Sequence, residues 1–160
     1  MAYIRVKKIK DQNYAYLVEN KNTSSGPRQK VKRYLGRVHK LEGTNGNHSK
    51  MEGDGILHAL TISELKKLGF ARKGEGYVYR NLIFSCSEHS LKKKTKSNTY
   101  KEAVISLNGG YLCSFTLQRI ANFKRTKDFN SDAYILARYF LESGLQIGEE
   151  DFVKFYQALR

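Results

Sequence analysis

The sequence contains no tryptophan, only one proline and only two cysteines among its 160 residues. Two cysteines, Cys86 and Cys113, are too few for the set of disulfide bonds that stabilises a small secreted domain. No apolar run approaches the roughly 20 residues that a membrane helix needs, and charges stand where a signal peptide has its apolar stretch. These shortages argue against a disulfide scaffold and a membrane protein, and they lead us to expect a cytoplasmic location.

Acidic residues are also scarce, with 15 Asp and Glu against 29 Lys and Arg, which gives a formal net charge of +14. Hydrophobic residues make up 40% of the chain, enough for a folded core. The basic residues are interleaved with Tyr and Phe, which favours a folded surface for a polyanion over a disordered basic tail. A solvated surface of the thermophile kind is the alternative, but such surfaces usually enrich Glu together with Lys.

The positive charge falls into two blocks. Residues 1–42 hold 11 basic and 3 acidic residues, and residues 61–127 hold 14 basic and 4 acidic residues. Residues 128–160 hold 3 basic and 6 acidic residues, so this last part of the chain is net negative. The distribution predicts a basic surface made of two parts with a neutral or acidic back.

The residue pattern predicts an α+β fold: an N-terminal antiparallel β-meander, then a mixed α/β segment, then C-terminal helices. In residues 1–42, Tyr14, Tyr16 and Val18 alternate with other residues at the period of a strand. Residues 43–55 include four glycines and predict a flexible linker or exposed loop between this basic module and a second domain, 56–160.

Local signals predict where the helices of the second domain begin. Thr61, with Glu64 three residues later, matches a capping box, and Ser114 is a candidate cap for a second helix. Ser131 or Asp132 is the predicted start of a third helix. Acidic residues that complement a helix dipole predict the first turn of the last helix: Glu149, Glu150 and Asp151.

Basic and aromatic residues on the predicted meander are the strongest functional signal. Alternate residues of a strand share a face, so we expect Lys30, Lys32 and Tyr34 on one face of the third strand, with Val31, Arg33 and Leu35 on the other. Such a face supplies cations for phosphates and rings for unpaired bases. The candidate residues of this first group are Arg5, Lys7, Lys8, Lys10, Tyr14, Tyr16, Lys30, Lys32, Arg33, Tyr34 and Arg37.

Two further basic groups lie in the second domain. The second group has four lysines in five residues, which suits a phosphate backbone or simply a solvated charge run: Lys92, Lys93, Lys94 and Lys96. The third group lies on and after the predicted second helix, where it also complements that helix's dipole: Arg119, Lys124 and Arg125. The sequence does not show whether the three groups meet on one surface.

Signals for catalysis or cofactors are weak. Cys86-x-x-His89 has the spacing of metal ligands, but a complete site would need distant residues such as His58, so free thiols are the favoured interpretation. No histidine lies in a catalytic motif, and no glycine-rich phosphate loop is present. We therefore expect no metal and no cofactor. A metal-dependent nuclease remains an alternative that would draw on Asp128, Asp132, Glu149, Glu150 and Asp151.

Residues 12–36, which run from Gln-Asn-Tyr-Ala-Tyr-Leu-Val-Glu to Arg-Tyr-Leu-Gly, resemble the opening segment of many insertion-sequence transposases. The catalytic acidic triad of those enzymes has no counterpart, so the resemblance implies an accessory module that handles nucleic acid, without strand transfer. The chain also resembles small basic archaeal proteins of unassigned function. Residues 109–113 and the stretch up to 123–125 are the second part of that resemblance.

These observations predict a non-enzymatic nucleic-acid-binding protein, with RNA or a ribonucleoprotein such as the ribosome favoured over DNA as its partner. A DNA-binding module related to mobile elements is the first alternative, and it would depend on Arg119 and Arg125. The metal-dependent nuclease is the second alternative. A protein partner bound through the C-terminal helices is a further alternative.

Overall fold

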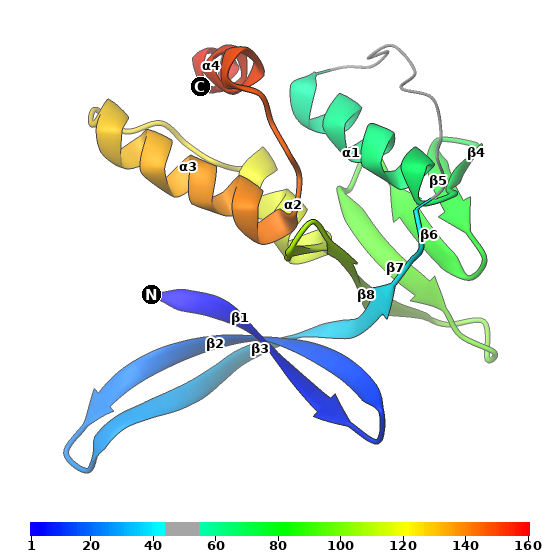
Figure 1. Cartoon of the computed structure of the whole chain (residues 1–160), viewed down its shortest axis with the longest axis horizontal. Coiled ribbons are helices and arrows are strands. Elements are labelled where there is room, and N and C mark those ends of the chain that lie inside the picture. Colours follow the sequence, from blue (N-terminus) through cyan, green and yellow to red (C-terminus); the bar gives the residue numbers. More distant parts are fainter. Residues whose placement is uncertain (44–54) are drawn as a thin grey trace.

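The computed structural model describes residues 1–43 and 55–160 (Figure 1). Its strands are β1 Ala2–Ile9, β2 Gln12–Thr23, β3 Gly26–Lys40, β4 Ala71–Lys73, β5 Gly76–Tyr79, β6 Leu82–Ser85, β7 Ser90–Lys94, β8 Tyr100–Leu107 and β9 Gly110–Cys113. Its helices are α1 Ile56–Lys67, α2 Ser114–Ala121, α3 Phe129–Ser143 and α4 Glu149–Ala158. The predicted α+β class, with an N-terminal meander and C-terminal helices, is confirmed. Among the described residues, no helix is long and apolar enough to cross a membrane.

The strands form one mixed sheet in the order β1-β2-β3-β8-β7-β6-β5-β4, with β9 paired to β8. All the strand pairs are antiparallel except β3 with β8, which run parallel. In that pair, Arg37 lies beside Ala103 and Lys40 beside Ser106. The predicted N-terminal module and second domain therefore share a sheet, and β3 is the strand that joins them (Figure 1).

A two-residue turn closes the β1–β2 hairpin. Lys10 and Asp11, between the paired residues Ile9 and Gln12, have φ angles of 48° and 63°. Positive φ at both central residues is typical of the type I′ turn, whose twist matches that of the flanking strands.

The predicted alternation along β3 is wrong, because two irregularities interrupt its pairing with β2. Tyr16 lies opposite Tyr34, but the next residue of β2 towards the N-terminus, Ala15, lies opposite Gly36, so Leu35 is an extra residue. A second shift makes Lys32 extra. Each extra residue reverses the alternation of side chains, as in a β-bulge. Tyr34 therefore lies opposite Tyr16, while Lys32 pairs with Glu19 on the other face, at 2.9 Å.

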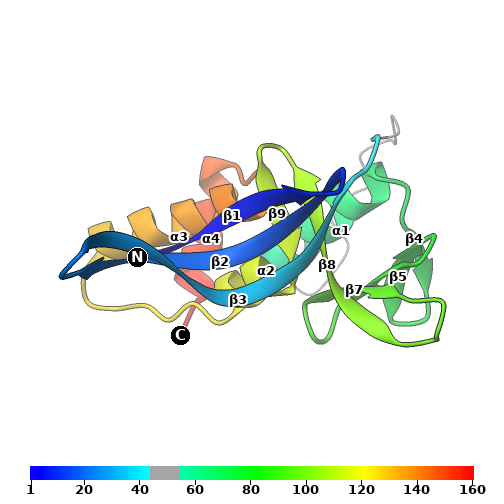
Figure 2. The same ribbon diagram turned by 90° about the horizontal axis from the view of Figure 1, so that it is seen from below.

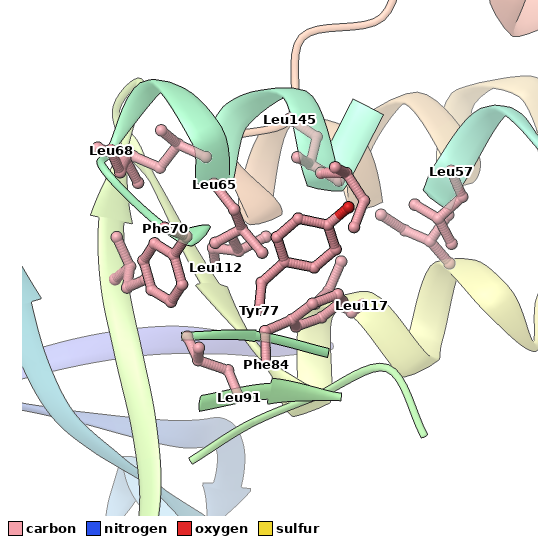
Figure 3. Packing of buried hydrophobic residues seen from close by; sticks show 14 of the residues in the cluster. Leu57, Leu65, Leu68, Phe70, Tyr77, Phe84, Leu91, Leu112, Leu117 and Leu145 are labelled. Atoms are coloured by element: carbon pink, nitrogen blue, oxygen red, sulfur yellow. The ribbon is translucent and has the colours of Figure 1, made fainter. Parts of the chain in front are cut away.

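Two clusters of buried side chains hold the sheet and the helices together. The larger cluster fills the space between α1 and strands β5–β8 and continues to α2, α3 and α4 (Figure 3). Leu65, Leu91 and Leu117 are fully buried there. Burying each leucine contributes roughly 1.5–3 kcal/mol to folding. The smaller cluster lies under the meander, where Ala15 and Leu35 pack with Val104 and Cys113.

The helix starts differ from the sequence predictions. α1 begins at Ile56, so Thr61 lies inside the helix and its hydroxyl donates to the carbonyl of Leu57 at 2.7 Å, while Glu64 pairs with Lys67. The predicted capping box is therefore absent. Apolar packing of the first turn, which buries Leu57, allows the earlier start.

Two more helix starts are corrected. Cys113 is the N-cap of α2, and Ser114 instead accepts a bond from the Leu91 amide. α3 begins at Phe129, two or three residues before the predicted start, because the Asp128 carboxylate accepts bonds from the amides of Asn130 and Ser131. The acidic first turn of α4 is confirmed. Residues 44–54 of the predicted linker 43–55 lie outside the described ranges.

Candidate nucleic-acid interface

One face of the meander carries tyrosines and cations. Residues directly opposite each other in an antiparallel pair share a face. Because β1, β2 and β3 are paired in this way, the register assembles one set of side chains, which we call the tyrosine face: Tyr3, Arg5, Lys7, Tyr14, Tyr16, Tyr34 and Arg37. Of the residues on the helix-facing side, Ile4, Val6, Ala15, Leu17 and Leu35 belong to the smaller core cluster.

The rings of the tyrosine face contact one another. The centroid of Tyr34 lies 5.3 Å from that of Tyr16 and 6.4 Å from that of Tyr14. The ammonium group of Lys7 lies 5.5 Å from the centroid of the Tyr16 ring. Burial, and then the neighbouring hydroxyls of Tyr16 and Tyr14, raise the pKa of Tyr34, so its hydroxyl stays protonated at neutral pH. Together the rings form a small aromatic platform edged by positive charge.

No helix covers the tyrosine face among the described residues. Seen from below, β1, β2 and β3 lie in front of the helices (Figure 2), and the smaller core cluster, which includes Phe115 of α2, packs against the opposite face. Arg5 and Lys7 are exposed, and Tyr34 retains 48% of its accessible surface. The side chain of Gln29 bridges Arg5 and Tyr3 by hydrogen bonds. The face is therefore accessible and partly pre-ordered.

The other basic residues of the first group lie elsewhere on the meander. Lys10 is in the β1–β2 turn, and Lys8 forms a solvent-exposed ion pair with Asp11 at 3.5 Å. Lys30 lies opposite Glu19 and Arg33 opposite Leu17, on the same side of the sheet as Lys32. The structure therefore divides the predicted first group between two faces and a turn. The bulges of β3 account for the positions of Lys30 and Lys32.

The parallel pairing of β3 with β8 brings the first and second groups together. Arg37 lies beside Ala103, two residues along β8 from Lys101, and Lys101 lies directly opposite Lys93 of β7. Since alternate residues share a face, Arg37, Lys101 and Lys93 continue the tyrosine face as far as the larger core cluster, which buries Ala103 on the same face of β8. Lys92 belongs to the reverse face, where it lies opposite Glu102 and 3.7 Å from Glu88. The remaining lysines of the group, Lys94 and Lys96, are exposed at the end of the β7–β8 hairpin.

His39 lies within this junction. Its Nε2 atom is buried and has no hydrogen-bond partner among residues 1–43 and 55–160. Burial, and then the positive charges of Lys93 and Arg37, lower the pKa of His39 to about 4, so the imidazole is neutral at pH 7. Arg37 is two residues from His39 on β3, so the two side chains share a face of the sheet. We call Arg37, His39, Lys93 and Lys101 the His39 cluster.

The third group lies in the helical layer, away from the tyrosine face. Arg119 forms an ion pair with Glu142 of α3, and its guanidinium lies 3.9 Å from the Tyr139 ring centroid and 4.8 Å from that of Phe115. These contacts fix Arg119 between α2 and α3. Arg125 lies 4.7 Å from the centroid of Tyr156, and Lys124 is exposed. The structure does not bring these three residues to the tyrosine face.

The acidic residues of the nuclease alternative have structural partners. Asp128 caps α3. Asp132 is 1% exposed, and its carboxylate accepts from the Thr126 amide, the Thr126 hydroxyl and the Tyr156 hydroxyl at 2.7, 2.8 and 2.9 Å. Burial raises the pKa of Asp132, but those hydrogen bonds and the charge of Arg125 outweigh it and leave the pKa below its ordinary value. Helix-dipole pairing accounts for the acidic start of α4.

The cysteines and histidines of the second domain are dispersed. Within residues 1–43 and 55–160, no three His, Cys, Asp or Glu side chains are placed to hold a metal ion. Cys86 is half-buried and Cys113 is buried, both as free thiols, and burial raises the pKa of each. Burial, and then the nearby His58, lower the pKa of His89. Two of the residues named for the weak metal signal, His58 and His89, are therefore neighbours, but they are not part of a ligand cluster.

An apolar groove of about 670 Å³ lies between α3 and α4, lined by residues that include Ala137, Phe140, Ile147 and Phe152. Leu141, at its edge, is 75% exposed. That a protein partner binds through the C-terminal helices stays a prediction.

The sequence did not point to two members of the surface, Lys101 and His39. Lys101 lay outside the run of lysines, and His39 lacked a motif. Tyr3 alternates with Ile4 and therefore shares a strand face with Arg5 and Lys7, and it belongs to the tyrosine face. Lys101 and His39 required the pairing of β3 with β8, which joins segments more than 60 residues apart. No family model matches this chain, and neither the curated proteins nor the solved structures include one that matches it.

Proposed function

We propose that the protein binds single-stranded nucleic acid, RNA in preference to DNA, along the tyrosine face and its extension over β8 and β7. The observation that carries the proposal is the platform of Tyr14, Tyr16 and Tyr34 on a sheet face that no described helix covers. Unpaired bases stack on such rings, and each stacked base contributes roughly 1–3 kcal/mol to binding.

The charges around the platform support the same proposal. Arg5 and Lys7 flank it on β1, Arg37 lies on β3, and Lys93 and Lys101 follow on β7 and β8. In the described part of the chain, none of these five cations is in an ion pair with a carboxylate. These five cations are therefore available to bind phosphates. They lie on several strands of the sheet, so a bound chain of phosphates would run across the strands.

The positions of the side chains support the two alternative functions less well than they support RNA binding. The mobile-element alternative depends on Arg119, which is fixed between α2 and α3. The nuclease alternative depends on Asp128 and Asp132, which serve as a helix cap and a buried acceptor. We therefore propose a binding role without catalysis, either on free RNA or within a ribonucleoprotein.

The test is fluorescence anisotropy with one labelled sequence presented as single-stranded RNA, single-stranded DNA, duplex RNA and duplex DNA, each over a salt series. We expect the tightest binding for single-stranded RNA, with affinity that falls as salt rises because released counterions drive phosphate binding. Preference for duplex DNA would favour the mobile-element alternative. Affinity that does not change with salt would contradict the proposal.

A further inference from the structure

Three cations of the His39 cluster lie on neighbouring strands, and no described acidic side chain forms an ion pair with them. Lys93 and Lys101 lie directly opposite each other on β7 and β8, an arrangement of like charges that destabilises a sheet. Arg37 adds a third charge from β3. The nearest carboxylate of β8, Glu102, is on the reverse face, where it accepts a hydrogen bond from the Ser114 hydroxyl at 2.8 Å. No described carboxylate is in an ion pair with any of the three cations.

The imidazole of His39 independently indicates that the His39 cluster lacks a hydrogen-bonding partner. A buried polar atom normally has a hydrogen-bond partner, and leaving one unpaired costs roughly 1–3 kcal/mol. His39 Nε2 is buried and unpaired, and it lies close to Arg37 and Lys93. Repelling cations and an unpaired nitrogen at one point would both be relieved by a single anion.

We propose that the His39 cluster is an anion site that holds one phosphate group, and that His39 takes up a proton when the phosphate binds. That this phosphate belongs to an RNA backbone rests on the proposed function, whereas the site itself does not. Arg37 belongs to both the tyrosine face and the cluster, so a nucleotide stacked near Tyr34 would have a neighbouring phosphate at the cluster. A phosphate anion favours the charged imidazolium, as any opposite charge within reach does.

The direction of the pH effect follows from the groups around His39. Arg37 from β3, Lys93 from β7 and Lys101 from β8 are all cationic, and from β2 the Tyr14 side chain lies opposite Arg37. Burial, with Lys93 and Arg37, holds the pKa of free His39 at about 4. A bound phosphate raises that pKa. Phosphate affinity therefore increases as the pH falls through the bound-state pKa towards about 4, by up to tenfold per unit of pKa shift.

The experiment follows the imidazole signals of the intact protein by NMR through a pH titration, at constant ionic strength. The additions are sodium chloride, inorganic phosphate, or a short single-stranded RNA, and H39N identifies the signal of His39. We expect phosphate and RNA each to raise the pKa of His39 by about one unit or more over its value in chloride. The pKa of His89, which burial lowers, should not change, because His89 lies outside the cluster.

Variants separate anion binding from structural effects. In K93M/K101M the pKa of free His39 should rise, because a like charge is removed, and the further rise caused by phosphate should be lost. K154M, which removes an exposed lysine of α4, should behave as the natural protein does. Retention of the native spectrum outside the cluster confirms that the variants fold.

The outcomes distinguish the two proposals. If neither phosphate nor RNA moves the pKa of His39, the anion site is wrong, even if RNA still binds elsewhere on the tyrosine face. If inorganic phosphate moves it and RNA does not bind, the anion site stands and the proposed function fails. A shift with both that K93M/K101M abolishes supports both proposals.

Discussion

Gly36 of β3 lies against the backbone of Glu102 in β8, so close that a Cβ atom on Gly36 would stand 2.5 Å from the Glu102 carbonyl oxygen. Its φ angle of +129° is also one that residues with a side chain rarely adopt. The parallel pairing of β3 with β8 begins at the next residue, Arg37. The absence of a side chain at Gly36 therefore permits the junction on which the extended surface depends.

Replacement of Gly36 should weaken this junction. G36A adds a steric clash with backbone atoms to the strain of a positive φ, whereas G26A adds strain alone, because a Cβ atom on Gly26 would have no neighbour within 4 Å. We expect G26A to cost about 1–2 kcal/mol of stability and G36A to cost clearly more. Urea unfolding of both variants measures the difference. Equal losses would show that the close approach to Glu102 is unimportant.

Removal of the most exposed ring of the platform should weaken RNA binding. Tyr34 is 48% exposed, so Y34A is expected to lower the affinity for single-stranded RNA about tenfold or more with little loss of stability. Y134A is the matched control, since Tyr134 on α3 is 68% exposed and lies off the platform. Anisotropy titrations give the affinities, and equal effects of the two variants would exclude specific stacking.

Neutralising a cation beside the platform should change the salt dependence of binding. K7M removes the ammonium group that lies 5.5 Å from the Tyr16 ring centroid. If Lys7 contacts one phosphate, the slope of log K against log salt becomes shallower by about 0.7 for a single strand. K154M should leave the slope unchanged, because Lys154 lies on α4. A slope that K7M does not alter would remove Lys7 from the interface.

Asp132 should stabilise the fold in a pH-dependent way. Its pKa is lowered on folding from the ordinary value of 3.8, so its stabilisation is fully present above pH 3.8 and is lost as the pH falls through the folded-state pKa. D132N should therefore unfold several degrees below the natural protein at neutral pH, with a smaller difference in acid. Y156F, which loses one of the three bonds to Asp132, should lower the midpoint by less. Thermal unfolding at two pH values measures both.

The two thiols should differ in reactivity. Cys86 is half-buried, whereas Cys113 is 1% exposed and lies in the smaller core cluster. Because the thiolate is the reactive form and burial raises both pKa values, labelling by a thiol reagent at neutral pH should be slow, with Cys86 modified first. Cys113 should react only after denaturant is added. Mass spectrometry of the digested protein identifies the labelled residue.

Much of the fold could be predicted from local patterns. The strands of the meander and the helices at the C-terminus follow from side-chain periodicity, which depends on near neighbours in the chain. The helix starts could not be predicted as well, because burial of Leu57 and the cap by Asp128 prevailed over the signals at Thr61 and Ser131. Ser114, which would suit a cap, instead bonds to Leu91 of β7, a contact between distant segments.

The candidate site could be predicted only in part for the same reason. Tyr14, Tyr16 and Tyr34 were selected from the sequence, but the face shared by Tyr34 depends on bulges that the alternation of residues does not reveal. Arg37 and Lys93 lie on the same surface only because β3 pairs in parallel with β8, a strand that is distant in the sequence. Arg119 looked like a surface cation, yet a carboxylate and two rings on neighbouring elements hold it inside the helical layer.

The parallel pairing of β3 with β8 also means that the sheet cannot be completed until β8 has been translated. The inner edge of β3 pairs with Ala103–Ser106, which are translated more than 60 residues after Arg37. Until they emerge, the nascent meander presents unpaired backbone groups along that edge, and such an edge readily pairs with another chain. The N-terminal module is therefore complete only after β8 has been translated and has paired along that edge.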